Sequence, residues 1–130
     1  MTRLFVYGSL KSGLSGAPLM HGAEFLGSTE TEPKYSLRVY EGYPALGPGD
    51  QSISGEIYKV NEAVLARLDE YEDAPTVYFK AEVELSKGAP AISYFLSAVF
   101  WQKATPTNTT QWAEKGRIAK TSTDALLKDR

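Results

Sequence analysis

A regular alternation of apolar and polar residues from Val77 to Leu85 places the tightest limit on the possible folds of this chain. Apolar side chains occupy every second position, and tyrosine, lysine and glutamate lie between them. This period of two is typical of a β-strand with one buried face. Further β-prone runs, bounded by glycine- and proline-containing turns, predict strands at residues 4–7, 25–31, 35–40, 52–60 and 91–101.

The connections between these strands follow from their glycine, proline and serine content. Residues 8–23 predict a long loop with one helical turn, and residues 42–50 consist of turn-forming residues throughout. Gly55, inside the run 52–60, indicates a β-bulge.

One segment, from Asn61 to Asp73, is predicted to form a firm helix. Asn61 is a favourable N-cap residue, and the negative charge of Glu62 suits the first turn of a helix. Pro75 ends the helical pattern soon after Asp73, because proline cannot continue a helix.

The polar tail from Thr105 onward predicts only a weak C-terminal helix, anchored by Trp112 and Ile118. No repeat or linker interrupts the chain, so residues 1–130 are expected to form a single domain. The expected fold class is α+β, a small β-barrel with one firm helix packed on it. We expect one shared core, formed by residues 4–6, Ile57, Leu65, Leu68, Val83 and Phe95.

Composition excludes several classes of function. The net charge is −2 and the lysines and arginines are scattered, which argues against nucleic acid and anionic membrane surfaces as partners. The chain has no cysteine and one histidine, His21, so thiolate chemistry and multi-histidine metal sites are excluded. Without a signal-like segment or a run of membrane-spanning length, we expect a cytoplasmic protein.

Glu72 breaks the pattern of the predicted helix. On a helical wheel it falls in the apolar stripe, seven positions after Leu65 and four after Leu68. A carboxylate in apolar surroundings loses solvation, so its pKa should rise above the usual value of about 4.3. A raised pKa suits a general acid/base near neutral pH, and Glu72 is therefore the candidate catalytic residue. Two structural alternatives stay open at this point: Glu72 frays into water at the helix end, or it pairs with Lys80 or Arg38.

The loop that follows the first strand is a candidate anion-binding element. A sharp turn after Tyr7, through Gly8, Ser9 and Leu10, leaves backbone N–H groups that can hold a carboxylate or an oxyanion. A plain strand-to-loop turn is the alternative, and no Gly-Lys-Ser/Thr follows to make it a P-loop.

Two further groups of residues bear on the location of the site. Most of the eight tyrosines are expected to pack inside the barrel, but Tyr7, Tyr78 and Tyr94 are candidates to line a cavity with their hydroxyls inward. The acidic residues between 69 and 73 spread around the helix, which favours a solvated face over a metal site.

Five short blocks of this sequence, in order, resemble the γ-glutamyl cyclotransferase-like superfamily, in particular its γ-glutamylamine cyclotransferase (AIG2-like) branch. The first block resembles the family's Tyr-Gly-Ser/Thr-Leu loop and the second its proline-containing middle loop. The third resembles a Gly-Glu-aromatic strand, the fourth a Leu-Asp-x-x-Glu helix end, and the fifth a Tyr-x-Arg strand. They lie at residues 4–11, 42–46, 54–58, 65–72 and 78–80.

The resemblance implies a small mixed β-barrel with flanking helices, an enzyme without metal or cofactor, and a small-molecule γ-glutamyl substrate. In such an enzyme the α-amine of an L-γ-glutamyl group attacks its own γ-carbonyl, giving 5-oxoproline and a free amine. The family's catalytic carboxylate maps onto Glu72. Its substrate-binding positions map onto Tyr7, Gly8, Ser9 and Leu10, with Tyr43 in the middle loop.

The chain departs from the family pattern at two positions near the expected site. Asp73 stands where glycine is common, and Lys80 stands where arginine is commoner and would make a bidentate contact. Both differences bear on substrate choice more than on reaction class. The alternative function is a non-catalytic small-ligand-binding barrel of the same fold. The sequence identifies neither the leaving amine nor the oligomeric state.

Overall fold

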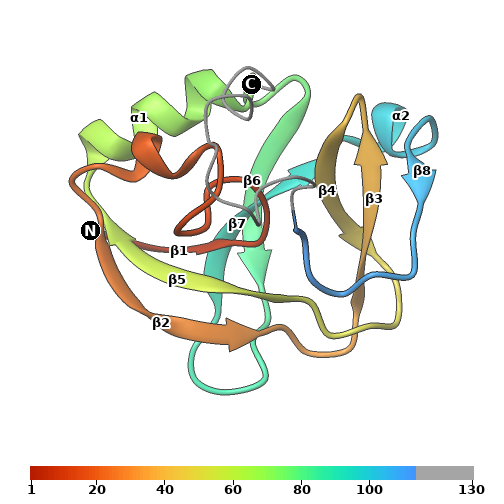
Figure 1. The fold of residues 1–130 in the computed structure, drawn as a ribbon, viewed down its shortest axis with the longest axis horizontal. Coiled ribbons are helices and arrows are strands. Elements are labelled where there is room, and N and C mark those ends of the chain that lie inside the picture. The colour runs from red at the N-terminus through yellow and green to blue at the C-terminus, as the bar shows by residue number, and fades with distance from the viewer. Residues whose placement is uncertain (114–130) are drawn as a thin grey trace.

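The computed structural model describes residues 1–113 of the chain, and Figure 1 shows a single mixed sheet with one long helix across its top. The elements in chain order are β1 (Thr2–Val6), the 3₁₀ turn η1 (Ala17–Met20), β2 (Glu24–Glu30), β3 (Tyr35–Tyr40), β4 (Tyr43–Pro48), β5 (Ser54–Val60), α1 (Glu62–Tyr71), β6 (Tyr78–Val83), β7 (Ala91–Leu96), α2 (Ala98–Trp101) and β8 (Thr105–Pro106).

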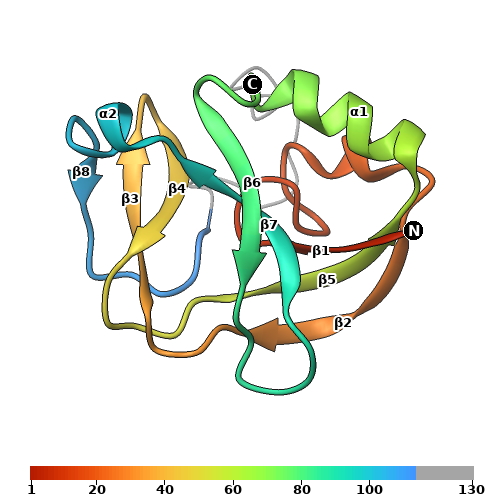
Figure 2. The same cartoon turned by 180° about the vertical axis from the view of Figure 1, so that it is seen from behind.

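The sheet branches at β7. The strand order is β2-β5-β1-β7-β4-β3-β8, and β6 pairs with β7 along its whole length. β1 runs parallel to the first part of β7, at Leu4 opposite Ile92, and β4 runs parallel to the last part, at Leu46 opposite Phe95. The chain therefore divides into a β2-β5-β1 part and a β4-β3-β8 part on either side of the β6–β7 hairpin, which Figure 2 shows from behind.

The mixed α+β character is confirmed, but the expected barrel is not. The path of paired strands begins at β2 and ends at β8, and no ladder joins these two edges within residues 1–113. An isolated bridge between Thr31 and Leu85 links the chain after β2 to the chain after β6. The sheet is therefore curved and open.

Residues 43–48 form the strand β4, although turns were predicted throughout 42–50. Only Glu41 and Gly42 form the turn, because Tyr40 pairs directly with Tyr43. Burial outweighs the local turn preference here, since Leu46 is wholly buried between its neighbouring strands.

Two other local predictions are corrected by the structure. The strand predicted to end at residue 101 ends at Leu96, and α2 follows it. The bulge lies in β2, between Phe25 and Gly27, and not at Gly55. Gly55 is needed instead because a Cβ atom there would lie 2.5 Å from the ring of Phe5.

The weak C-terminal helix is absent from the part of the tail that the structure describes. Residues 105–113, which include Trp112, hold the short strand β8 and no helix. The other predicted anchor, Ile118, lies outside the described residues. No helix in residues 1–113 is long and apolar enough to cross a membrane.

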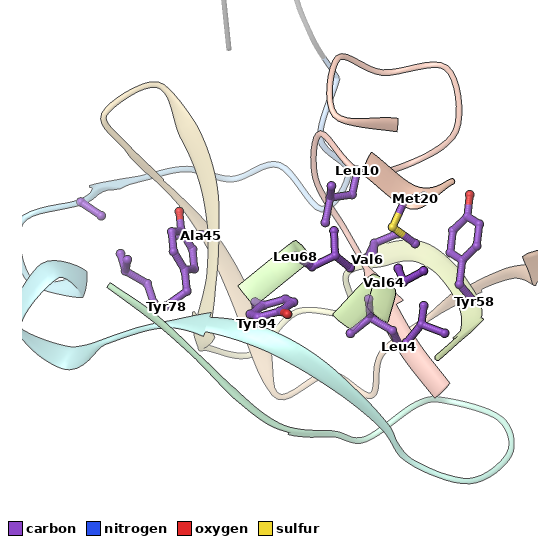
Figure 3. Packing of buried hydrophobic residues seen from close by; sticks show 13 residues of the cluster. Leu4, Val6, Leu10, Met20, Ala45, Tyr58, Val64, Leu68, Tyr78 and Tyr94 are labelled. Atoms are coloured by element: carbon purple, nitrogen blue, oxygen red, sulfur yellow. The ribbon is translucent and has the colours of Figure 1, made fainter. Parts of the chain in front are cut away.

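The apolar residues form two clusters and not one, because successive side chains of a strand point to opposite faces of the sheet. Leu4 and Val6 lie in the cluster beneath α1 with Leu68 (Figure 3). Leu65 packs against this cluster. The remaining predicted core members lie in the second cluster or against it, namely Phe5, Ile57, Val83 and Phe95.

Candidate functional site

A cleft of about 190 Å³ opens where the sheet branches. Its walls come from the end of β1 and the following loop, the β3–β4 turn, the end of α1, and the start of the β6–β7 hairpin. All eight residues predicted for the site line this cleft. They are Tyr7, Gly8, Ser9, Leu10, Tyr43, Glu72, Tyr78 and Tyr94.

Glu72 lies at the C-cap of α1 and not inside the helix as predicted. The last helical residue is Tyr71, and the Glu72 amide still donates to the Leu68 carbonyl at 2.9 Å. Asp73 then takes a left-handed backbone conformation, with φ of 54°, and turns the chain away from the helix. Leu68 is wholly buried one turn earlier, so the end of α1 is fixed against the core and holds Glu72 at the cleft.

The environment of Glu72 favours its neutral form. Burial, together with a smaller contribution from the adjacent charge of Asp73, raises the pKa of this carboxyl from 4.5 to about 7. The side chain is half-buried, so it retains some contact with solvent. Near neutral pH the group is therefore present in both protonation states, which is what an acid/base catalyst requires.

Glu72 does not fray into water, because its amide stays bonded to the Leu68 carbonyl and its side chain is half-buried. The ion pair with Lys80 or Arg38 is contradicted as well. Lys80 pairs with Asp69, at 2.8 Å between Nζ and Oδ2. Arg38 stacks on the Trp101 ring and donates to the Trp101 carbonyl at 2.7 Å. Within residues 1–113 no salt bridge reaches Glu72.

The loop after β1 is fixed against both sides of the cleft. Gly8 lies directly on Pro44, where a Cβ atom would come within 2.4 Å of the proline Cγ, so no larger residue fits. The Ser9 hydroxyl lies 3.2 Å from the Tyr71 hydroxyl at the end of α1. The loop closes on itself through the Gly16 amide, which donates to the Ser9 carbonyl at 2.7 Å.

The Glu56 carboxylate holds the same loop through Ser12, a role that sequence reasoning missed. One carboxylate oxygen accepts from the Ser12 amide at 2.8 Å, and the other accepts from the Ser12 hydroxyl at 3.0 Å. Tyr58 donates to the same carboxylate at 2.9 Å. The Gly-Glu-aromatic block contains Glu56, but nothing in the sequence indicated that Ser12 would be its partner.

The tyrosine hydroxyls are used inside the protein and are not free donors pointing into the cavity. Tyr7 donates to the Tyr94 carbonyl at 2.8 Å and accepts from the Leu46 amide at 3.2 Å, which joins β7 to β4 beyond the end of β1. Tyr78 donates to the Pro44 carbonyl at 3.2 Å, and Tyr94 donates to Asp69. Burial raises the pKa of Tyr7, Tyr78 and Tyr94, so all three stay protonated. Their rings shape the cleft, and their hydroxyls fix the strands and the helix around it.

The cleft also contains residues that the sequence did not single out for the site. Tyr40, Glu41 and Pro44 come from the β3–β4 hairpin, and Tyr71 lies beside Glu72. The sequence does not indicate this hairpin, because residues 42–50 are turn-forming residues. Among residues 1–113 there is no group of three or more histidine, aspartate or glutamate side chains placed to hold a metal ion.

Comparison with known proteins identifies the family. The family model for γ-glutamyl cyclotransferase, AIG2-like, matches residues 4–116, which is most of the chain. This chain belongs to that family.

The relatives agree with this assignment. A Vibrio cholerae protein named "Putative gamma-glutamylcyclotransferase" is 41% identical over 85 residues, covering 65% of this chain and 74% of its own. The zebrafish (Danio rerio) γ-glutamylaminecyclotransferase A is 36% identical over 92 residues, covering 63% and 57%. The crystal structure of a mouse AIG2-like protein superposes with a TM-score of 0.74 at 27% identity, covering 89% of this chain and 90% of its own. The resemblance stated from the sequence is confirmed, and the names of the relatives support an enzyme of this family.

Proposed function

We propose that this protein cyclises L-γ-glutamyl compounds, releasing 5-oxoproline and a free amine. The observation that carries the proposal is Glu72, a half-buried carboxyl with a pKa of about 7, on the wall of a cleft that also holds the loop from Tyr7 to Leu10. Family membership supports the same reaction class.

The reaction needs a proton acceptor and a proton donor, and Glu72 is suited to both roles. The ionised carboxylate takes a proton from the substrate α-ammonium, and the resulting amine attacks the γ-carbonyl carbon. A C–N bond to the α-nitrogen forms, and the C–N bond to the leaving nitrogen breaks. Two protons leave the α-nitrogen and two arrive on the leaving nitrogen, so the amine departs as an ammonium ion without net proton uptake. Acid/base catalysis of this kind contributes typically 10²–10⁴-fold.

The nucleophile and the electrophile belong to one molecule, so the remaining task of the protein is orientation. We assign the glutamyl end of the substrate to the loop of Gly8, Ser9 and Leu10, whose backbone N–H groups suit a carboxylate or a developing oxyanion. The rings of Tyr43, Tyr78 and Tyr94 would enclose the folded glutamyl chain. The direct contact of Gly8 with Pro44 supports this assignment, because it fixes the loop at the cleft wall.

The proposal predicts release of 5-oxoproline from a panel of L-γ-glutamyl amides and peptides. The N-acetylated versions of the same compounds are the matched control, because acetylation removes the nucleophilic amine and should stop turnover completely. Products are identified by chromatography and mass spectrometry. Turnover of the acetylated compounds would show hydrolysis in place of cyclisation. Binding of the compounds without any release of 5-oxoproline would support the non-catalytic binding protein instead.

A further inference from the structure

Two separate turns bring acidic side chains to the cleft beside Glu72. Glu41 comes from the turn between β3 and β4, and Asp73 follows the end of α1. Both residues are exposed, so they lie where the cleft meets solvent. Within residues 1–113 they are the two non-glycine residues with positive φ, at 50° and 54°.

Glu41 occupies a turn position with positive φ, which glutamate rarely adopts. Glu41 and Gly42 connect β3 to β4 with positive φ at both positions, the pattern of a type I′ hairpin turn. Asparagine, aspartate and glycine are preferred at the first of these positions, and glutamate is not. Local turn stability therefore does not explain the glutamate.

The negative charge of Glu41 affects the pKa of Tyr78, a residue that lines the cleft. Burial raises the pKa of Tyr78, the charge of Glu72 raises it further, and the charge of Glu41 adds a smaller contribution. The carboxylates of Glu41 and Glu72 thus act on the same cleft residue, from two different elements.

No basic side chain balances these carboxylates among the described residues that line the cleft. The cations nearest in sequence to the site are engaged elsewhere. Lys11 donates to the Trp112 carbonyl, Lys80 pairs with Asp69, and Arg38 donates to the Trp101 carbonyl. The cleft is therefore acidic at its opening, where a substrate bound by its glutamyl end would place its leaving group.

We propose that Glu41 and Asp73 select γ-glutamyl compounds whose leaving amine carries a second, protonated amino group, and disfavour leaving groups that carry a carboxylate. The compound class is the γ-glutamyl diamines. This inference rests on the proposed cyclisation, because it concerns the leaving group of that reaction. The two carboxylates attract a cation at the cleft opening and repel an anion there.

Three substrates of equal length test the proposal. The L-γ-glutamyl derivatives of 1,4-diaminobutane, n-butylamine and 4-aminobutyrate present a cationic, a neutral and an anionic end. We expect kcat/KM for 5-oxoproline release to fall in that order, with a ratio of roughly tenfold between cation and anion at low salt. Because both carboxylates are exposed, the ratio should shrink toward one near 1 M salt, where the Debye length is about 3 Å.

The variants Glu41→Asn and Asp73→Asn remove the charges and keep backbones that tolerate positive φ. The ratio of cationic to anionic kcat/KM should fall in each single variant and to within about twofold in the double variant. Asp73→Asn also changes the pKa of Glu72, but this change affects all three substrates equally. It therefore cancels in the ratio of their kcat/KM values. Glu70→Gln is the control, because it removes one exposed negative charge that does not line the cleft.

The outcomes separate this inference from the proposed function. Turnover of all three substrates with equal kcat/KM, or an equal loss of preference in Glu70→Gln, would overturn the selectivity and leave cyclisation intact. Binding of the same three compounds to the Glu72→Gln variant is measured by calorimetry, so the preference can be determined without turnover. Stronger binding of the cationic compound supports the role of Glu41 and Asp73, even if no 5-oxoproline is released. Absence of any charge preference in binding would overturn it.

Discussion

Replacing Glu72 by glutamine is expected to lower the rate of 5-oxoproline release by 10²–10⁴-fold or more. Glutamine keeps the volume and hydrogen-bonding capacity of the side chain, but it cannot accept and return a proton near neutral pH. Substrate affinity should change much less than the rate, because the proposed binding loop is separate from Glu72. The measurement is single-turnover release of 5-oxoproline with saturating substrate, together with calorimetric binding.

The same variant should be at least as stable as the unmodified protein, and the difference should depend on pH. The pKa of Glu72 is about 7 in the fold and 4.5 as its ordinary value, so the folded state holds this proton more tightly. Protonated Glu72 therefore contributes to the free energy of unfolding at low pH. This contribution is lost as the pH rises from 4.5 through 7. At pH 8 the glutamine variant should be more stable by up to about 3 kcal/mol, and near pH 4 the difference should vanish.

Glu70→Gln is the matched control for both measurements, because Glu70 is exposed on the same helix end and does not line the cleft. It should alter neither rate nor stability appreciably. Near-full activity of Glu72→Gln on a confirmed substrate would show that the acid/base assignment is wrong. Loss of folding in Glu72→Gln would show that the carboxylate has a structural role.

Replacing Leu68 by alanine is expected to have the largest effect on stability. Leu68 is wholly buried beneath α1, in the cluster that contains Leu4 and Val6. Removing its side chain costs the lost burial and leaves a cavity, together about 2–5 kcal/mol. That is a large part of the roughly 5–15 kcal/mol that stabilises a typical domain. Urea unfolding followed by circular dichroism measures the change.

Leu65→Ala is the control for this prediction, because Leu65 is only half-buried and packs at the edge of the same cluster. Its loss of stability should be clearly smaller. Equal losses for the two variants would mean that the end of α1 is not held through Leu68, and that Glu72 is fixed by other contacts.

The sequence predicts well those elements that bury one face, because their apolar residues recur with the period of a strand or a helix. The alternation from Val77 to Leu85 gives the strand β6, and the stripe of Val64 and Leu68 gives α1 with its N-cap at Asn61. The strand β4 could not be predicted, because its prolines and glycines suggest turns and its strand state depends on burial between β3 and β7. The branching of the sheet could not be predicted either. It arises because β1 and β4 both pair with β7, which lies far from each of them in the sequence.

The candidate site was predictable in its members but not in its details. Glu72 stands out on the helical wheel, and the eight predicted residues do meet in one cleft. The prediction that the hydroxyls of Tyr7, Tyr78 and Tyr94 point into the cavity was wrong, because each hydroxyl donates to a partner within the protein. Glu41 could not be recognised from the sequence, because its place at the cleft depends on the hairpin that the sequence failed to predict.

The pH dependence of kcat/KM for 5-oxoproline release tests the proposed role of Glu72 most directly. The reactive combination is ionised Glu72 with a protonated substrate ammonium, so the profile should be bell-shaped. Its acid limb should have an apparent pKa of about 7, equal for substrates with different leaving groups. In Asp73→Asn this limb should move to lower pH, because the charge of Asp73 raises the pKa of Glu72. A profile without an acid limb near pH 7, or with a limb that Asp73→Asn leaves unmoved and that follows the substrate instead, would contradict the assignment of Glu72 as the acid/base.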